Sequence, residues 1–129
     1  YTLENNYSAR LKLDNRPVLP KSLRRAIEYI KQHASENLTV DELVRITEVS
    51  ERSLFNSFKQ CLDMTPMQFV QKHRLANARL QLLDPAQSLH LSVTEIAFNN
   101  GFSQLGRFSA HYKSVYGELP SATKARFMD

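Results

Sequence analysis

Hydrophobic residues recur every three or four positions along most of the chain after Pro20, which predicts a series of amphipathic helices. Residues 1–20 lack this period and are interrupted by Pro17 and Pro20, so we interpret them as an N-terminal arm or linker. The first predicted helix covers residues 21–34, and its apolar side consists of Leu23, Ala26, Ile27, Ile30 and Ala34. The chain therefore divides into an arm over 1–20 and a helical domain over 21–129.

Capping signals indicate where the shorter helices begin. Thr39 with Glu42, and Ser92 with Glu95, have the spacing of a capping box. In a capping box, the side chain of each residue accepts a hydrogen bond from the backbone amide of the other. Ser50 is also a favoured N-cap. Each capping box starts a short apolar stripe, and a second, longer stripe follows each short one after a turn.

The longest predicted helix begins at Thr65, because Pro66 follows it and proline is favoured at the first helical position. No Gly or Pro interrupts the sequence until Asp84-Pro85, which ends the helix. Residues 65–83 would span about 28 Å at about 1.5 Å per residue.

The two halves of the domain form an internal repeat. At an offset of 53 residues the first half matches the second through Leu38, Val40, Glu42, Leu43, Val44 and Val49, and at an offset of 54 through Leu54, Phe58, Lys59 and Pro66. A short capped helix, a tight turn and a longer helix make a helix-turn-helix. The sequence thus predicts an all-α fold of about seven helices, with two helix-turn-helix motifs joined by a long linker helix.

The second helix of each motif carries a polar face suited to DNA, because Arg, Asn and Gln can pair with the edges of guanine and adenine. No acid occurs over 65–83 or 97–117, as expected of a face that meets phosphates. We assign base readout to Arg52, Ser53, Asn56 and Gln60 in the first motif and to Gln104, Arg107, Ser109 and Ala110 in the second. Lys59, Lys113, Lys72 and Arg74 are candidates for phosphate contacts or for the solvated face of the linker helix. We expect the second helices to lie exposed on a common face, so that they reach successive major grooves.

Residues from about Ser22 to Arg126 resemble the DNA-binding domain of the AraC/XylS transcription regulators, and the details resemble the XylS-type branch. The resemblance is carried by Arg74-Leu75-x-x-Ala78, Ile96-Ala97, Gly101-Phe102, Leu105-Gly106-Arg107-Phe108, Tyr112-Lys113 and Gly117-Glu118-Leu119-Pro120-Ser121. It implies seven helices and one bipartite site in double-stranded DNA. It also implies a cytoplasmic bacterial regulator that contacts RNA polymerase, with an effector or dimerisation domain missing from this fragment.

Several residues depart from the family pattern, mostly in the second motif. Glu48 stands where the first turn usually has Gly, which would force a non-glycine residue toward positive φ. Gln104 replaces a small capping residue, so Ser103 is a candidate cap instead, and Gly106 weakens the helix that follows. Leu119 replaces a Thr cap, and Thr123-Lys124 replaces a common aromatic-Arg pair. We therefore expect the second motif to be the less stable of the two.

The composition of the chain excludes several classes of protein and several kinds of site. The 17 Lys and Arg against 13 Asp and Glu give a net charge of +4, which is compatible with a polyanionic partner. One Cys excludes an internal disulfide framework and a cysteine-rich zinc module, and no apolar run approaches the length of a membrane span. The four His lack metal-ligand spacing, and no nucleophile constellation or phosphate loop occurs. We expect no enzymatic activity, no metal, no cofactor and no membrane partner.

Two other classes of function stay open at this point. A helical protein–protein module, for example a surface for RNA polymerase with little DNA affinity of its own, would also use helix pairs. Salt-dependent binding to duplex DNA distinguishes it from a DNA-binding domain. An alkyl-transfer protein would use Cys61 as acceptor, but Cys61 shares the stripe of Leu54 and Phe58, so we expect it to be buried. Phe55 lies beside that stripe, where it can either fill the core or touch a thymine methyl.

Overall fold

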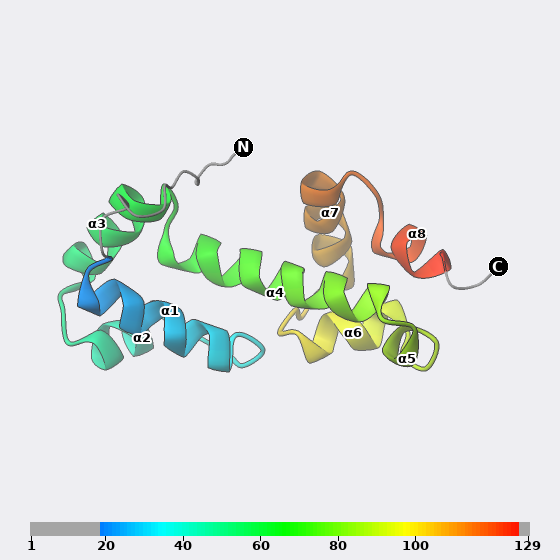
Figure 1. The fold of residues 1–129 in the computed structure, drawn as a ribbon, viewed down its shortest axis with the longest axis horizontal. Coiled ribbons are helices and arrows are strands. Elements are labelled where there is room, and N and C mark those ends of the chain that lie inside the picture. The colour runs from blue at the N-terminus through cyan, green and yellow to red at the C-terminus, as the bar shows by residue number, and fades with distance from the viewer. Residues whose placement is uncertain (1–18, 127–129) are drawn as a thin grey trace.

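The computed structural model describes residues 19–126, and these form eight helices (Figure 1). The helices are α1 (Lys21–His33), α2 (Val40–Thr47), α3 (Glu51–Leu62), α4 (Pro66–Leu83), α5 (Pro85–Ser88), α6 (Val93–Asn99), α7 (Leu105–Tyr116) and α8 (Pro120–Ala125). The all-α class, the two helix-turn-helix motifs (α2–α3 and α6–α7) and the linker helix α4 are confirmed. Residues 1–18 of the proposed arm lie outside the described residues. Among the described helices, none is long and apolar enough to cross a membrane.

The helix that the sequence did not predict is α5, a single turn directly after α4. Asp84-Pro85 stops α4 as expected, but the same two residues also start a new helix. The Asp84 carboxylate accepts a hydrogen bond from the Ala86 amide at 3.1 Å, and Pro85 occupies the first helical position.

The predicted caps form with one difference in each motif. Thr65–Gln68 and Ser92–Glu95 make complete capping boxes, and the Ser50 hydroxyl accepts from the Ser53 amide. Thr39 accepts from the Glu42 amide, but the Glu42 carboxylate is engaged by the Tyr29 hydroxyl of α1 instead of completing the box. The first helix-turn-helix is thereby fastened to α1.

The second motif begins without the cap that we expected. The N-cap residue of α7 is Gln104, and its side chain makes no capping hydrogen bond, so the prediction that Ser103 caps this helix is wrong. Leu119 likewise provides no side-chain cap for α8. Both helices therefore begin without a side-chain cap, in line with the departures in the sequence.

Two separate hydrophobic cores hold the halves together, and α4 contributes to both. The first core includes Leu23, Ile30, Leu43, Leu54, Phe58 and, from α4, Val70. The second includes Ile96, Phe108, Tyr112 and, from α4, Leu75, Ala78 and Leu82. The amino-terminal part of α4 thus belongs to the first motif and its carboxy-terminal part to the second.

The position of the two recognition candidates follows from this division. In Figure 1, α3 lies at the amino-terminal end of α4 and α7 lies above its carboxy-terminal half, whereas α1, α2, α5 and α6 lie below α4. That both second helices are exposed on a common face stays a prediction.

Glu48 adopts the left-handed conformation that its place in the turn demands. Its φ is 60°, and its amide donates to the Val44 carbonyl at 2.9 Å to close α2. Gly101, at the corresponding turn of the second motif, has φ 91°. A residue with a Cβ pays a conformational cost at positive φ that Gly avoids.

We therefore expect Glu48→Gly to raise the free energy of unfolding by about 0.5–1 kcal/mol, the left-handed cost less the extra chain entropy of Gly. Urea unfolding followed by circular dichroism measures it. Glu48→Ala is the matched control, because it removes the carboxylate and keeps the Cβ. A Gly variant no more stable than the Ala variant would contradict the explanation.

Candidate nucleic-acid interface

The first candidate helix, α3, buries one stripe and leaves its polar face to solvent. Leu54 and Phe58 are in the first core. All four residues that we assigned to base readout from this helix are exposed: Arg52, Ser53, Asn56 and Gln60. Because residues three and four apart lie on one helix face, they form a continuous polar stripe.

Phe55 borders this stripe. It is half-buried and is not among the side chains that pack against the first core. On the helix surface its neighbours are Arg52, three residues before it, and Lys59, four residues after it. The structure therefore places Phe55 at the edge of the polar face and not within the hairpin core.

The second candidate helix, α7, buries Phe108 and Tyr112 in the second core. Of the residues assigned to readout, Gln104, Arg107 and Ala110 are exposed, whereas Ser109 is half-buried beside Phe108. The exposed face also includes Leu105, Gly106 and His111, which our assignment missed. Gly106, two residues before Phe108, lies nearly opposite it on the helix and could have been identified from the sequence, whereas Leu105 and His111 lie near the side of Phe108 and could not.

The candidate phosphate-binding lysines point to solvent. Lys59 and Lys113 are exposed at matching positions of α3 and α7, and Lys72 is exposed on α4. Lys59 lies 3.5 Å from the Asp63 carboxylate, with both side chains largely exposed. Such a surface ion pair contributes little, so it leaves the lysine able to engage another anion.

Arg74 does not belong with these lysines, and our assignment of it to phosphate contact is wrong for this structure. The residue is only 7% exposed. Its Nε donates to the Ala34 carbonyl at 2.6 Å and its Nη2 to the Glu36 carbonyl at 2.8 Å. Burial lowers the pKa of its guanidinium below the usual value. The sequence showed a cation on a polar helix, but the partner carbonyls are some 40 residues away and gave no signal.

A cleft of about 800 Å³ separates the two halves where they meet at α4. Arg74, Gln71 and Met67 line it from α4, Gln104, Arg107 and His111 from the start and middle of α7, and residues 35–38 from the first half. Two of the exposed readout candidates, Gln104 and Arg107, thus lie beside the junction between the halves.

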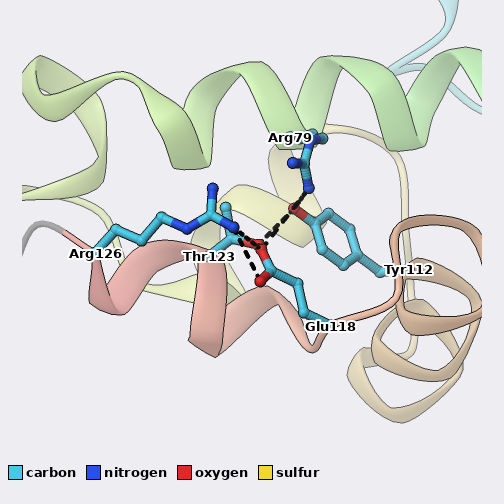
Figure 2. Close-up of polar contacts among 5 residues, drawn as sticks. All are labelled: Arg79, Tyr112, Glu118, Thr123 and Arg126. Carbon is cyan, nitrogen blue, oxygen red and sulfur yellow. Dashed lines mark hydrogen bonds and ion pairs between the residues drawn. The ribbon is translucent and has the colours of Figure 1, made fainter.

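A polar network fastens α7 and α8 to α4 (Figure 2). Arg79 donates to the Tyr112 hydroxyl at 3.1 Å, and the Tyr112 and Thr123 hydroxyls lie 2.9 Å apart. Thr123 donates to the Glu118 carboxylate, so Tyr112 is the donor to Thr123 and the four groups form one directed chain. Arg126 donates to both Glu118 oxygens, at 3.0 and 2.9 Å. This network fixes the carboxy-terminal end of the second motif.

Cys61 is exposed, so the expectation that it fills the core is wrong. Leu62, about 100° further around the helix, packs against the first core instead. Within residues 19–126 no group of three or more His, Cys, Asp or Glu side chains is placed to hold a metal ion.

The sequence profile of the family described as "Helix-turn-helix domain" matches residues 43–126, from the middle of α2 to the end of α8. The chain is 42% identical over 120 residues to a probable thc operon regulatory protein of Rhodococcus erythropolis, and 36% identical over 102 residues to the XylDLEGF operon transcriptional activator of Pseudomonas putida. The chain belongs to the AraC/XylS family of transcription regulators.

The aligned residues of this AraC/XylS-type domain cover 92% and 79% of the chain, but only 35% and 32% of those two relatives. The chain thus spans about a third of their length. The crystal structure of a probable AraC family transcriptional regulator from Rhodopseudomonas palustris superposes with a TM-score of 0.77 at 33% identity, covering 84% of this chain and 98% of that one. The DNA-binding domain of AdpA, in complex with a target DNA, shares the fold with a TM-score of 0.72 at 23% identity, covering 84% and 94%.

The network in Figure 2 makes the stability of the second motif depend on pH. The hydrogen bond from Thr123, with the nearby charges of Arg126 and Arg79, lowers the pKa of Glu118 below 4.5. A carboxyl group with a lowered pKa stabilises the fold above its unfolded pKa, and that stabilisation is lost as pH falls through the folded pKa.

Glu118→Gln should therefore be less stable than wild type at pH 7, and its stability should fall less steeply below about pH 4.5. Urea unfolding at a series of pH values measures both effects. Glu51→Gln, at an exposed carboxylate, is the matched control. Parallel pH profiles for wild type and Glu118→Gln would show that Glu118 does not supply this stabilisation.

Proposed function

We propose that this domain regulates transcription by binding one bipartite site in double-stranded DNA, with α3 and α7 in successive major grooves. The observation that carries the proposal is that α3 and α7 each bury one stripe and expose a polar face, and that α4 joins the cores they belong to. Successive major grooves on one face of DNA are about 34 Å apart. The 18 residues of α4 span about 27 Å, which is the right order of length to hold two motifs at that separation. The shared fold with a DNA-bound domain supports the same arrangement.

The first motif would read its half-site through Arg52, Ser53, Asn56 and Gln60. Arg52 suits a guanine edge, and Asn56 and Gln60 suit adenine edges. Phe55, at the border of the same stripe, is placed to touch a thymine methyl.

The second motif would read a different sequence. By the repeat, Arg52 corresponds to Gly106 and Asn56 to Ala110, so the two helices present different chemistry at matching positions. Arg107 and Gln104 would supply the polar contacts to the second half-site. Ala110, and Ser109 at the edge of the exposed face, would supply the contacts from small side chains. The proposed site is therefore asymmetric.

Lys59, Lys113 and Lys72 would neutralise phosphates along the same side. Their contacts would release counterions, which makes binding fall with salt whatever the sequence. Both α4 and α7 lack acidic residues, so the approach of the DNA backbone meets no like charge from them.

Regulation would take place in the cytoplasm and would further involve RNA polymerase. Effector binding or dimerisation would reside outside residues 19–126. The roughly threefold greater length of the two relatives supports the latter proposal. A protein–protein module without DNA affinity is the competing function, and it predicts no salt-dependent binding to duplex DNA.

Selection from random duplexes, followed by titrations at several salt concentrations, tests the proposal. Wild-type protein should enrich a two-part sequence. Arg52→Ala should weaken binding by about 1–3 kcal/mol and relax one position of the first half-site, and Lys59→Ala should lower the salt slope by about 1 on any sequence. We expect the Arg52 and Lys59 variants to lose more affinity than Arg107→Ala and Lys113→Ala, because α7 lacks a cap and contains Gly106.

A matched control is Glu28→Ala, at an exposed residue of α1, below α4 in Figure 1, which should leave binding unchanged. Selection of no sequence, with no salt dependence, would reject DNA binding. If the Arg107 and Lys113 variants prove the more damaging, the ranking of the two motifs is wrong while the bipartite site stands.

A further inference from the structure

The two halves of the domain depend on α4 for their relative placement. Their hydrophobic cores are distinct, and α4 passes from the first, at Val70, to the second, at Leu75. Arg74 lies on α4 between these two residues. A helix that joins two cores fixes their separation, but their relative orientation needs a contact off the helix axis.

Arg74 makes that contact with the first half. The Ala34 and Glu36 carbonyls, which accept its two hydrogen bonds, belong to the segment between α1 and α2. One planar guanidinium therefore spans two backbone carbonyls that lie 40 and 38 residues earlier in the chain. An ammonium group, which is a single point of charge, does not reproduce this fork.

The second half approaches the same guanidinium at Gly101, in the turn between α6 and α7. A Cβ at Gly101 would lie 2.9 Å from the Arg74 Nε and 3.1 Å from the Ala34 carbonyl oxygen. Real Cβ atoms do not approach that closely, so glycine at this position permits the contact. The left-handed φ of 91° adds a second reason for glycine there.

We propose that Arg74 is a positioning residue for DNA recognition, because it sets the orientation of the second motif relative to the first and with it the half-site spacing that the domain accepts. The proposal rests on the bipartite function above. Arg107 and Gln104 line the same cleft as Arg74 and Glu36, so a shift at this junction moves the proposed readers of the second half-site directly.

Three duplex types measure the effect: the selected site, the same site with one base pair inserted or deleted between its halves, and the first half-site alone. Each added base pair turns the second half-site by about 35° around the duplex. Wild-type protein should prefer the selected spacing by about tenfold or more, which corresponds to about 1.4 kcal/mol.

Arg74→Lys should bind the isolated first half-site within about twofold of wild type, but should lose most of the preference for the selected spacing. Gly101→Ala perturbs the same junction from the other half and should have the same effect. Glu28→Ala, at an exposed residue of α1 outside this junction, is the control and should keep the wild-type preference.

The outcomes separate the two proposals. If wild-type protein shows no spacing preference, the bipartite function fails. If wild type shows the preference and both variants retain it, Arg74 does not position the motifs. Equal loss on the half-site and on the full site, with lowered urea stability in both variants, would also overturn the proposal, since it would indicate general destabilisation.

Discussion

The guanidinium of Arg74 is the point where three parts of the domain meet: the linker helix, the segment after α1 and the turn of the second motif. Each half has a core of its own, and hydrophobic burial relates the two halves only through α4, which contributes to both cores. A buried cation that satisfies two backbone carbonyls is costly to displace, because its loss leaves the buried Ala34 carbonyl and the partly buried Glu36 carbonyl without a partner. The relative position of α3 and α7 depends on this junction, and so does their use as a pair.

The exposed lysines lie on different helices from the acidic first turns of α2 and α6. Lys59, Lys72 and Lys113 are exposed on helices that contribute little acid, while α2 and α6, below α4 in Figure 1, have acidic residues in their first turns. The Figure 2 network acts within the second half only: it holds α7 and α8 against α4 through Tyr112 and Glu118. The network compensates in part for the missing caps of α7 and α8. It holds α7, a helix that would be weak in isolation, in place at its carboxy-terminal end.

Local chemistry made much of this predictable from sequence. The apolar period, the capping residues and the internal repeat gave seven helices, both motifs and the left-handed turn at Glu48, because each depends on residues within a few positions of one another. The errors concern contacts between distant segments. The sequence predicts Arg74 at the surface, although its hydrogen-bond partners lie in the first half. The replacement of the family's usual aromatic residue by Thr123 gives no sign in the sequence that Thr123 forms a hydroxyl chain with Tyr112. The hydrophobic period predicts which side of a helix is buried, but tertiary packing decides how far burial extends around the helix. Ser109 is therefore half-buried, and Cys61 is exposed.

For the bipartite function proposed above, one rigid pair of motifs must read two adjacent segments of a single DNA face. Hydroxyl-radical footprinting and guanine-methylation interference on the selected duplex test this arrangement. We expect two interference clusters in the major groove whose centres lie about 10–10.5 base pairs apart, with backbone protection on one face of the helix. A single cluster, or two clusters on opposite faces of the duplex, would contradict it.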